Sequence, residues 1–248
     1  MTARGNLSTP KSVTSKTSVA ILLLITAASI NAADIPNAIV RPQPQEDELK
    51  YFRQIQDHHE RIHDLVAPAV VAVECKNGRK EGVSFYGTGV VVSPEGMVLT
   101  SSTVVPGNGR SVQVYFPDGK VMDCNVVSTD ELTESCVLQV VRPANDTRKL
   151  PYVELSDSSK INVGELAYTA GNPFHTISRD GQVAWSVGTI SGRYNIVSAD
   201  EQSRYRGAVL ETDAAVNPGS DGGPLFDSNG RLIGVLSLCF CESRWLGT

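Results

Sequence analysis

Apolar and polar residues near the start of the chain follow a helical period. From Glu46 to Val66 the apolar positions recur at nearly helical spacing, as on one face of a helix. The oppositely charged residues Glu46 and Lys50 stand four apart, a spacing that supports an exposed helix face. We therefore expect an N-terminal helix over residues 46–67, ended by Pro68.

Beyond Pro68 the pattern changes to short β-rich runs, separated by Gly, Pro, Asp and Asn at intervals of about eight to twelve residues, which is typical of an all-β sandwich or barrel. The runs of the first half are Ala69–Glu74, Phe85–Val92, Met97–Ser101, Ser111–Phe116, Val121–Val127 and Cys136–Val141. Those of the second half are Tyr152–Leu155, Glu165–Ala170, Val183–Ser191, Ala208–Thr212, Pro224–Asp227 and Arg231–Leu238. We expect two halves, about 68–142 and 152–248, joined by Arg142–Pro151.

The stretch from Asn217 to Leu225 resembles the loop that carries the nucleophile in trypsin-type serine proteases. Its letters N-P-G-S-D-G-G-P-L follow the pattern G-x-S-G-G-P, in which a serine hydroxyl lies beside two backbone N–H groups that receive the oxyanion. Glycines are needed there because the backbone adopts conformations that a Cβ forbids. Asp221 stands at the serine position.

Several other motifs, in the same order and spacing, resemble the HtrA/Do-like family of serine proteases. Gly87–Thr100 is similar to the family pattern G-S-G-V-I-I-S-x-D-G-Y-I-L-T, and Thr103 then stands where the family has its histidine. Within Asp130–Gln139, Glu134 stands at the position of the orienting aspartate. The resemblance covers roughly residues 64–240, and its later landmarks are Gly171–Phe174, Ser186–Ser191 and Glu211–Gly219.

The resemblance implies an all-β, trypsin-like fold of two barrels over residues 68–248, preceded by the N-terminal helix. The family's closing strand has no counterpart near the end of the sequence, so we expect the second barrel to lack that strand or to close differently. An unpaired edge strand associates readily with other chains, which leaves a homo-oligomer as an open alternative. A truncated, non-functional product is another.

The resemblance places the triad positions at Thr103, Glu134 and Asp221, and none of them carries the family's residue. A threonine hydroxyl is no useful base near neutral pH, and the Asp221 carboxylate opposes an oxyanion held by the N–H groups of Gly219 and Asp221. Loss of a triad lowers turnover roughly 10⁶-fold. We expect no peptidase activity, and the alternative is a serine-type endopeptidase, as the family implies.

A function without cleavage also follows from the resemblance. In the family, substrate chains add as a strand beside the segment after the nucleophile loop, which here contains Leu232, Gly234, Leu236 and Leu238. The backbone groups of that strand do not depend on the triad. We therefore expect a pseudoprotease that binds peptides or unfolded proteins and that needs no cofactor.

The first 32 residues have the pattern of a secretory signal, because basic residues precede the apolar run Val19–Ile30, which is too short to span a bilayer. We expect residues 1–32 to be removed, with an uncleaved anchor as the alternative, and residues 33–45 to form a flexible lead-in. The protein is then secreted or periplasmic, without a membrane segment. Removing three basic residues takes the net charge from −5 to about −8, which argues against nucleic acid as a partner.

The stretch His59–His63 reads H-E-x-x-H, the zinc-protease signature, but no third ligand follows at a recognisable spacing. Our interpretation is a solvated helix with incidental histidines, and a zinc hydrolase through His59 and His63 is the minor alternative. We expect His175 on the surface. Another minor alternative is Ser220 as a nucleophile shifted by one residue. The turn argues against it, because neighbouring residues on a tight turn point in different directions.

Five cysteines leave one unpaired if disulfides form in an exported protein. Cys124 and Cys136 lie on consecutive predicted strands, and a disulfide across that hairpin is one interpretation, while buried thiols are the other. Cys239 and Cys241 make at most a weak metal site, because two thiolates without further ligands hold a metal poorly. We expect no metal.

Overall fold

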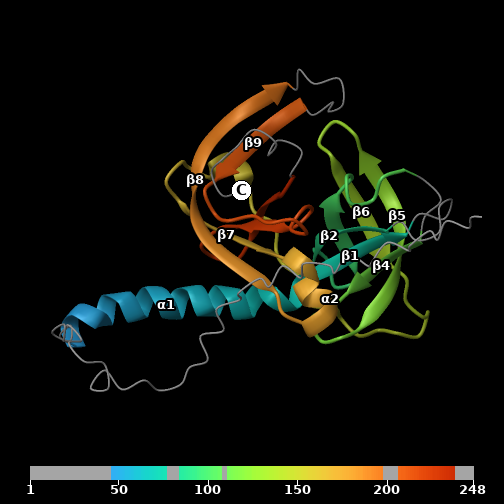
Figure 1. Ribbon diagram of the computed structural model, residues 1–248, viewed down its shortest axis with the longest axis horizontal. Helices are drawn as coiled ribbons and strands as arrows, with labels where there is room; N and C mark the ends of the chain where they lie inside the picture. Colours follow the sequence, from blue (N-terminus) through green and yellow to red (C-terminus); the bar gives the residue numbers. More distant parts are fainter. Residues whose placement is uncertain (1–45, 77–83, 108–110, 198–205, 238–248) are drawn as a thin grey trace, which may run out of the picture. The chain divides into compact units, whose positions relative to one another are not determined.

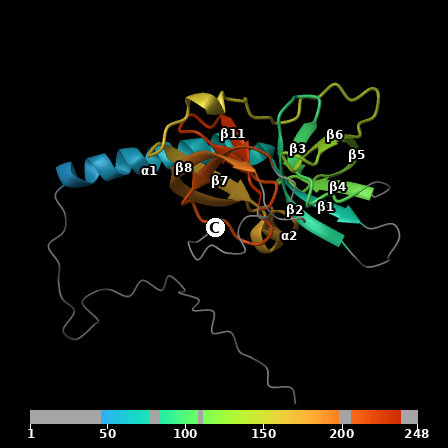
Figure 2. The same ribbon diagram turned by 90° about the horizontal axis from the view of Figure 1, so that it is seen from above.

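The computed structural model describes residues 46–76, 84–107, 111–197 and 206–237 (Figures 1 and 2). The chain divides into the units Met1–Glu48 and Leu49–Thr248, and both sheets belong to the second. Within the described residues no helix is long and apolar enough to cross a membrane. The expected signal and lead-in lie outside the described part of the chain.

The first sheet, as far as it is described, is a closed barrel with the strand order β1-β2-β3-β6-β5-β4, all antiparallel. Side chains alternate with the strand period of two: in β6, Cys136, Leu138 and Val140 are buried and the residues between them are not. The runs expected from the sequence are therefore present. The strands are β1 (Val70–Lys76), β2 (Ser84–Val91), β3 (Met97–Ser101), β4 (Ser111–Tyr115), β5 (Val121–Asp130) and β6 (Ser135–Val140).

The disulfide considered between Cys124 and Cys136 is wrong. Although the two residues lie on neighbouring strands, Cys124 stands opposite Val140 and Cys136 stands opposite Thr129. Both cysteines are free and buried in the barrel. Burial raises the pKa of the Cys124 thiol to about 12 and also raises that of Cys136, so these thiols act as small apolar side chains.

A buried carboxylate joins three strands of the barrel. Glu74 on β1 accepts hydrogen bonds from Ser84 and Tyr86 on β2, each 3.1 Å from Oε1, and from Tyr115 on β4, 2.5 Å from Oε2. Burial raises the pKa of Glu74, but the hydroxyl donors and Lys76 outweigh burial and leave the pKa below its ordinary value of 4.5. The hydrogen bond between Tyr115 and Glu74 raises the pKa of Tyr115 to about 12.

The second sheet is an open half-barrel in the described residues, with the strand order β11-β10-β7-β8-β9. β8 is longer than the sequence predicts and forms a long ribbon with β9 (Figure 1). Of the expected run Tyr152–Leu155, only Leu155 pairs, in an isolated parallel bridge to Leu232. The strands are β7 (Leu166–Gly171), β8 (Ala184–Val197), β9 (Arg206–Thr212), β10 (Pro224–Phe226) and β11 (Leu232–Val235). The expectation about a closing strand concerns residues that are not described.

Two α-helices are described, α1 (Glu46–Val66) and α2 (Thr176–Asp180). The sequence does not predict α2, which is only one turn long and begins where Asn172 Oδ1 accepts a hydrogen bond from the Ile177 N–H at 2.8 Å. The described residues also form short 3-10 turns at Ala67–Ala69, Ser158–Lys160 and Pro173–His175.

The C-terminal half of α1 lies against the second sheet. The ring of His59 contacts Tyr168 on β7, and the ring of His63 contacts Trp185 on β8, each with centroids 5.5 Å apart. Tyr168 and Trp185 stack on one another at 5.1 Å. The expected solvated helix with incidental histidines is therefore wrong for this half of α1, because its histidines pack on aromatic side chains.

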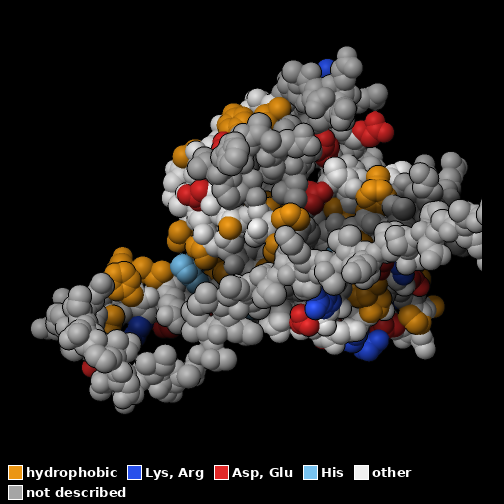
Figure 3. Space-filling model, in the orientation of Figure 1, with side chains coloured by type: hydrophobic (Ala, Val, Ile, Leu, Met, Phe, Trp, Pro, Cys, Tyr) orange, Lys and Arg blue, Asp and Glu red, His pale blue; other side chains and the backbone are white. Residues whose placement is uncertain are grey.

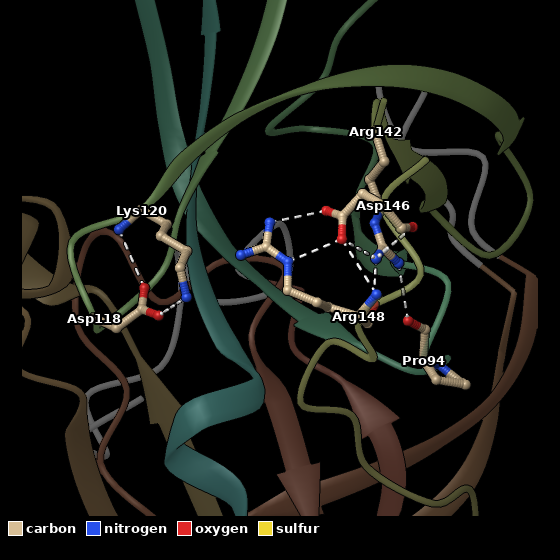
Figure 4. Close-up of polar contacts among 6 residues, drawn as sticks. All are labelled: Pro94, Asp118, Lys120, Arg142, Asp146 and Arg148. Atoms are coloured by element: carbon tan, nitrogen blue, oxygen red, sulfur yellow. Dashed lines mark hydrogen bonds and ion pairs between the residues drawn. The ribbon is translucent and has the colours of Figure 1, made fainter. Parts of the chain in front are cut away.

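One arginine holds the segment between the two sheets (Figure 4). Arg142 donates to the main-chain oxygens of Pro94 at 3.3 Å, of Asp146 at 3.0 Å, and of Arg148. Two hydrogen bonds from Arg148, at 2.9 and 3.0 Å, together with Arg142, hold the pKa of the Asp146 carboxyl well below its ordinary range. Because Pro94 lies between β2 and β3, this segment is fastened to the first barrel.

Candidate functional site

The three positions expected for the triad come from different elements and meet between the two sheets. Thr103 follows β3, Glu134 lies in the turn between β5 and β6, and Asp221 lies in the loop before β10. The main chain links the first two, since the Ser102 N–H donates to the Glu134 carbonyl at 2.9 Å. The side chains of Thr103 and Asp221 contact one another directly.

A chain of hydroxyl groups ends on the Asp221 carboxylate. The Thr103 hydroxyl donates to Asp221 Oδ2, so Ser101 is the donor in the 2.6 Å contact between Ser101 Oγ and Thr103 Oγ1. Ser101 Oγ also accepts a hydrogen bond from the Thr103 N–H at 3.2 Å. An ionised carboxylate only accepts hydrogen bonds. The arrangement therefore suits a carboxylate at this position, and sequence reasoning gave Ser101 no part in it.

Glu134 contacts the segment after β11 with its side chain. Its backbone is in the left-handed region, with φ +51°, and its Oε2 accepts a hydrogen bond from Ser237 Oγ at 3.0 Å. In this contact the side chain joins the first barrel to the end of the second sheet.

The loop around Asp221 needs glycine at two positions. Gly219 and Gly222 have φ values of +102° and +78°, which favour glycine. A Cβ on Gly219 would lie 2.6 Å from the Asn172 carbonyl oxygen, and one on Gly222 would lie 2.3 Å from Thr100 Oγ1. The loop thus has the tight backbone that the motif predicts.

Thr88 on β2 fastens this loop to the barrel, a role that the motif reading missed. Its hydroxyl donates to the Gly219 carbonyl at 2.7 Å and accepts from the Asn172 N–H at 2.9 Å. Its own N–H donates to the Asp221 carbonyl at 2.8 Å. The sequence did contain a signal for this role, because Thr88 stands in Gly87–Gly89 where the family pattern G-S-G has a serine, which is also a hydroxyl residue.

Ser220 is not placed as a shifted nucleophile. Its side chain is buried, with 7% exposed, whereas the neighbouring Asp221 is partly exposed and faces Thr103. His175 is half-buried, and its ring contacts Tyr86 with centroids 4.6 Å apart, so it is not the plain surface residue that we expected.

The zinc alternative has no ligand set in the part of the chain that the structure describes. There, no group of three or more His, Cys, Asp or Glu side chains is placed to hold a metal ion. His59 and His63 share a helix face, but both pack on aromatic rings. Cys239 and Cys241 lie outside the described residues.

Comparison with known proteins identifies the family. The model of the trypsin-like peptidase domain matches residues 87–235. The chain belongs to this family. A probable periplasmic serine endoprotease, DegP-like, of Bartonella henselae is 34% identical over 158 residues, which cover 64% of this chain and 29% of that protein. Protease Do-like 1, chloroplastic, of Arabidopsis thaliana is 31% identical over 241 residues, covering 92% of this chain and 50% of that protein.

A solved structure confirms the HtrA resemblance and the fold. The HtrA-type protease AlgW with tripeptide matches at a TM-score of 0.59 and 29% identity, covering 71% of this chain and 53% of that one. The trypsin-like domain described here is thus a homologue of HtrA-type serine proteases. The chain spans half or less of the length of the two relatives named above.

A pocket of about 480 Å³ lies beside β11 in this trypsin-like domain. Its lining includes residues of β8, β9, β10 and β11, the start of β6 and the turn before it. Val216, Leu225 and Ile233 supply apolar side chains, and Thr133 and Ser135 supply hydroxyl groups. A pocket of this size and character suits an apolar side chain.

The expected peptide-binding strand is partly engaged within the trypsin-like domain itself. Leu232 bonds through its N–H and carbonyl to the segment 154–156, and Leu236 bonds likewise to Gly222 and Gly223. The remaining expected positions are Gly234, which lines the pocket, and Leu238, which is not described. The part of β11 that faces the pocket is therefore the short stretch between Leu232 and Leu236.

Proposed function

We propose that this chain is an HtrA-like pseudoprotease, which binds extended peptides or unfolded chains and does not cut them. The observation that carries the proposal is the hydrogen bond from Thr103 to Asp221 at the place of the catalytic pair. A serine protease needs a hydroxyl nucleophile and a base that takes its proton. Here the hydroxyl of Thr103 stands at the position of the base, and the position of the nucleophile carries the Asp221 carboxylate, which has no hydroxyl group to activate.

Electrostatics in the same loop also oppose catalysis. Acyl transfer develops a negative charge beside the N–H groups that receive the oxyanion. The ionised Asp221 side chain belongs to one of the two residues expected to supply those groups. Two like charges about 4 Å apart repel by about 4 kcal/mol at an effective dielectric constant of 20, which corresponds to a rate loss of roughly 10³-fold.

A fluorophosphonate probe tests the inactivity, because labelling requires an activated hydroxyl. We expect the purified chain to stay unlabelled and to leave unfolded casein intact, while an HtrA-type protease treated in parallel is labelled and cleaves it. Labelling of this chain, or cleavage lost in Asp221→Ala, would establish the alternative, a serine-type endopeptidase. The names of the relatives favour that alternative.

Peptide binding is supported by the position of β11. Among the strands that the structure describes, β11 lies at one end of its sheet, and it runs beside the pocket. Main-chain pairing at a sheet edge provides affinity without any chemistry, and a neighbouring pocket provides specificity. The solved AlgW structure, of which this chain covers 53%, was obtained with a tripeptide.

Two substitutions of Gly234 form a matched pair of variants that tests peptide binding. A Cβ there lies 3.8 Å from Leu225, an ordinary contact, so Gly234→Ala should keep the pocket and its affinity. Gly234→Trp fills the pocket, and we expect the affinity for an extended apolar peptide, measured by fluorescence anisotropy, to fall at least about tenfold. Equal affinities of the two variants, or no binding of any arrayed peptide by the unaltered chain, would count against peptide binding.

We also propose that the protein is exported. The signal pattern of residues 1–32 and the word periplasmic in the names of relatives support this. Recovery of the protein only from the cytoplasm of a secreting host would contradict it.

A further inference from the structure

A second cavity, of about 460 Å³, lies where the end of α1 meets the first barrel and the loop before β8. Its lining includes the last turn of α1 and the two residues after that helix, the turn between β4 and β5, and Gly181–Val183. We call it the junction cavity. Its described lining residues include none of the pocket beside β11 and none of the triad positions. A cavity of this volume is in the range that holds a small molecule.

The walls of the junction cavity are apolar and held in place. Three of the lining residues are Pro68, Pro117 and Pro151, whose rings fix the backbone φ. Phe116, which also lines the cavity, is only 3% exposed. Gly181 packs so closely on the turn between β4 and β5 that a Cβ there would lie 2.5 Å from the Pro117 carbonyl oxygen. A preformed wall lowers the entropy cost of binding a ligand.

The polar part of the lining favours a positive charge. Among the described lining residues, Asp64 and Asp118 carry carboxylates, and none is a lysine or an arginine. Lys120, outside the lining, pairs with Asp118 at 2.5 Å (Figure 4) and holds the pKa of that carboxyl below its ordinary value of 3.8. The cavity also lies at the C-terminal end of α1, where the helix dipole adds a partial negative charge.

The wider surface does not supply this preference. On the face drawn in Figure 3, acidic and basic side chains both occur, and neither kind forms a continuous patch. Selection by charge therefore depends on the groups at the cavity itself.

We propose that the junction cavity binds a small apolar molecule that carries a protonated amine. The apolar body packs against the proline and phenylalanine wall, and the ammonium group donates hydrogen bonds to Asp64 and Asp118. An ionised carboxylate has acceptor sites for several donors. Asp64 therefore accepts the amine in addition to His63, whose Nδ1 lies 3.2 Å from its Oδ1, and Asp118 does so in addition to Lys120.

The exposure of the two carboxylates sets the size of the effect. The side chains of Asp64 and Asp118 are 81% and 53% exposed, and water and salt screen exposed ion pairs. We expect a ligand of about ten non-hydrogen atoms to bind with a dissociation constant of about 1 mM. The charge should improve this affinity about two- to fivefold over a neutral group of the same size.

Three probes that share one body and differ in the end group test the proposal: 4-phenylbutylamine, 4-phenyl-1-butanol and 5-phenylpentanoate. NMR titration of the full chain at pH 7 and low salt locates and ranks their binding. With the amine, we expect the amide signals of Gly181 and Gln182 to shift and that of Gly234, beside the other pocket, to stay. The amine should bind about two- to fivefold tighter than the alcohol, and the carboxylate more weakly than both. In about 1 M salt the preference for the amine should shrink, because screening acts within about 3 Å.

Asp64→Asn and Asp57→Asn form a matched pair of variants on α1. Both native side chains are exposed, so circular dichroism should match the unaltered chain, and only Asp64 lines the cavity. We expect Asp64→Asn to weaken binding of the amine about two- to fivefold and to leave binding of the alcohol unchanged. Asp57→Asn should leave both unchanged.

No shift with the amine up to about 10 mM, ten times the expected dissociation constant, would overturn the proposal. A shift of Gly234 in place of Gln182 would also overturn it, because the amine would then occupy the pocket beside β11. So would equal affinities for the amine and the carboxylate, or an Asp64→Asn variant that binds the amine as tightly as Asp57→Asn. The proposed peptide binding can fail without changing this result, because the two cavities share no described lining residue.

Discussion

Two carboxylates of this protein are each held by hydroxyl groups, in different surroundings. Asp221 accepts a hydrogen bond from Thr103 in a partly exposed loop. Glu74 is 8% exposed and accepts from three hydroxyl groups on neighbouring strands. A buried charge is tolerated only when it is well hydrogen-bonded, so a change at Glu74 should lower the stability more than a change at Asp221.

Glu74→Gln tests this at the residue scale. A carboxyl whose pKa is lowered on folding contributes stability above its unfolded-state value of about 4.5, and that stability is lost as the pH falls through the folded-state value. The amide presents an NH₂ group to hydroxyl donors, so we expect the free energy of unfolding at pH 7 to fall by about 1–3 kcal/mol. Urea unfolding at pH 7 and pH 3 measures this free energy. Ser84→Ala is the control with a smaller expected loss, because it removes one of the three hydroxyl donors and keeps the carboxylate.

The deficit of Glu74→Gln relative to the unaltered chain should shrink at pH 3, because the stability that the lowered pKa of Glu74 contributes is lost as the pH falls below 4.5 toward the folded-state pKa. A deficit of the same size at both pH values would show that the charge of Glu74 does not contribute.

At the scale of elements, the nucleophile-type loop depends on close packing against β2 and β3. Gly222→Ala combines a positive φ with a Cβ that would lie 2.3 Å from Thr100 Oγ1. Gly119→Ala has a similar φ of +84° but meets nothing within 4 Å. We expect the control to lose about 1–2 kcal/mol, the cost of a left-handed alanine, and Gly222→Ala to lose clearly more. Thermal unfolding of both variants compares them, and equal losses would refute the packing argument.

At the scale of the whole molecule, the two sheets still bring the expected triad positions together. We therefore expect the combined variant Thr103→His, Glu134→Asp and Asp221→Ser to react with a fluorophosphonate probe. Asp221→Ser alone should stay unlabelled, because a hydroxyl without a base is not activated. If the combined variant folds as the unaltered chain does and still gives no labelling, then replacement of the three triad residues does not by itself explain the inactivity.

The arrangement of the domain was largely predictable from the sequence, and several contacts were not. Period-two runs set apart by turn residues predicted the strands of the first barrel, because alternation along a strand is a local property. The extension of β8 to Val197 and the helix α2 were missed, because each depends on contacts with partners distant in sequence. For the same reason the register that separates Cys124 from Cys136 could not be seen in either strand alone.

The sequence by itself determined the HtrA-type family, the all-β trypsin-like fold and the identity of the residues at the expected triad positions, since these depend on residue types in a fixed order. Only the tertiary structure decided that the Thr103 hydroxyl donates to Asp221, that Thr88 fastens the loop, and that the α1 histidines pack on Tyr168 and Trp185. Each of these contacts joins segments far apart in the chain. Hydrogen bonds and ring contacts act over a few ångströms, so only folding determines which distant groups come within reach.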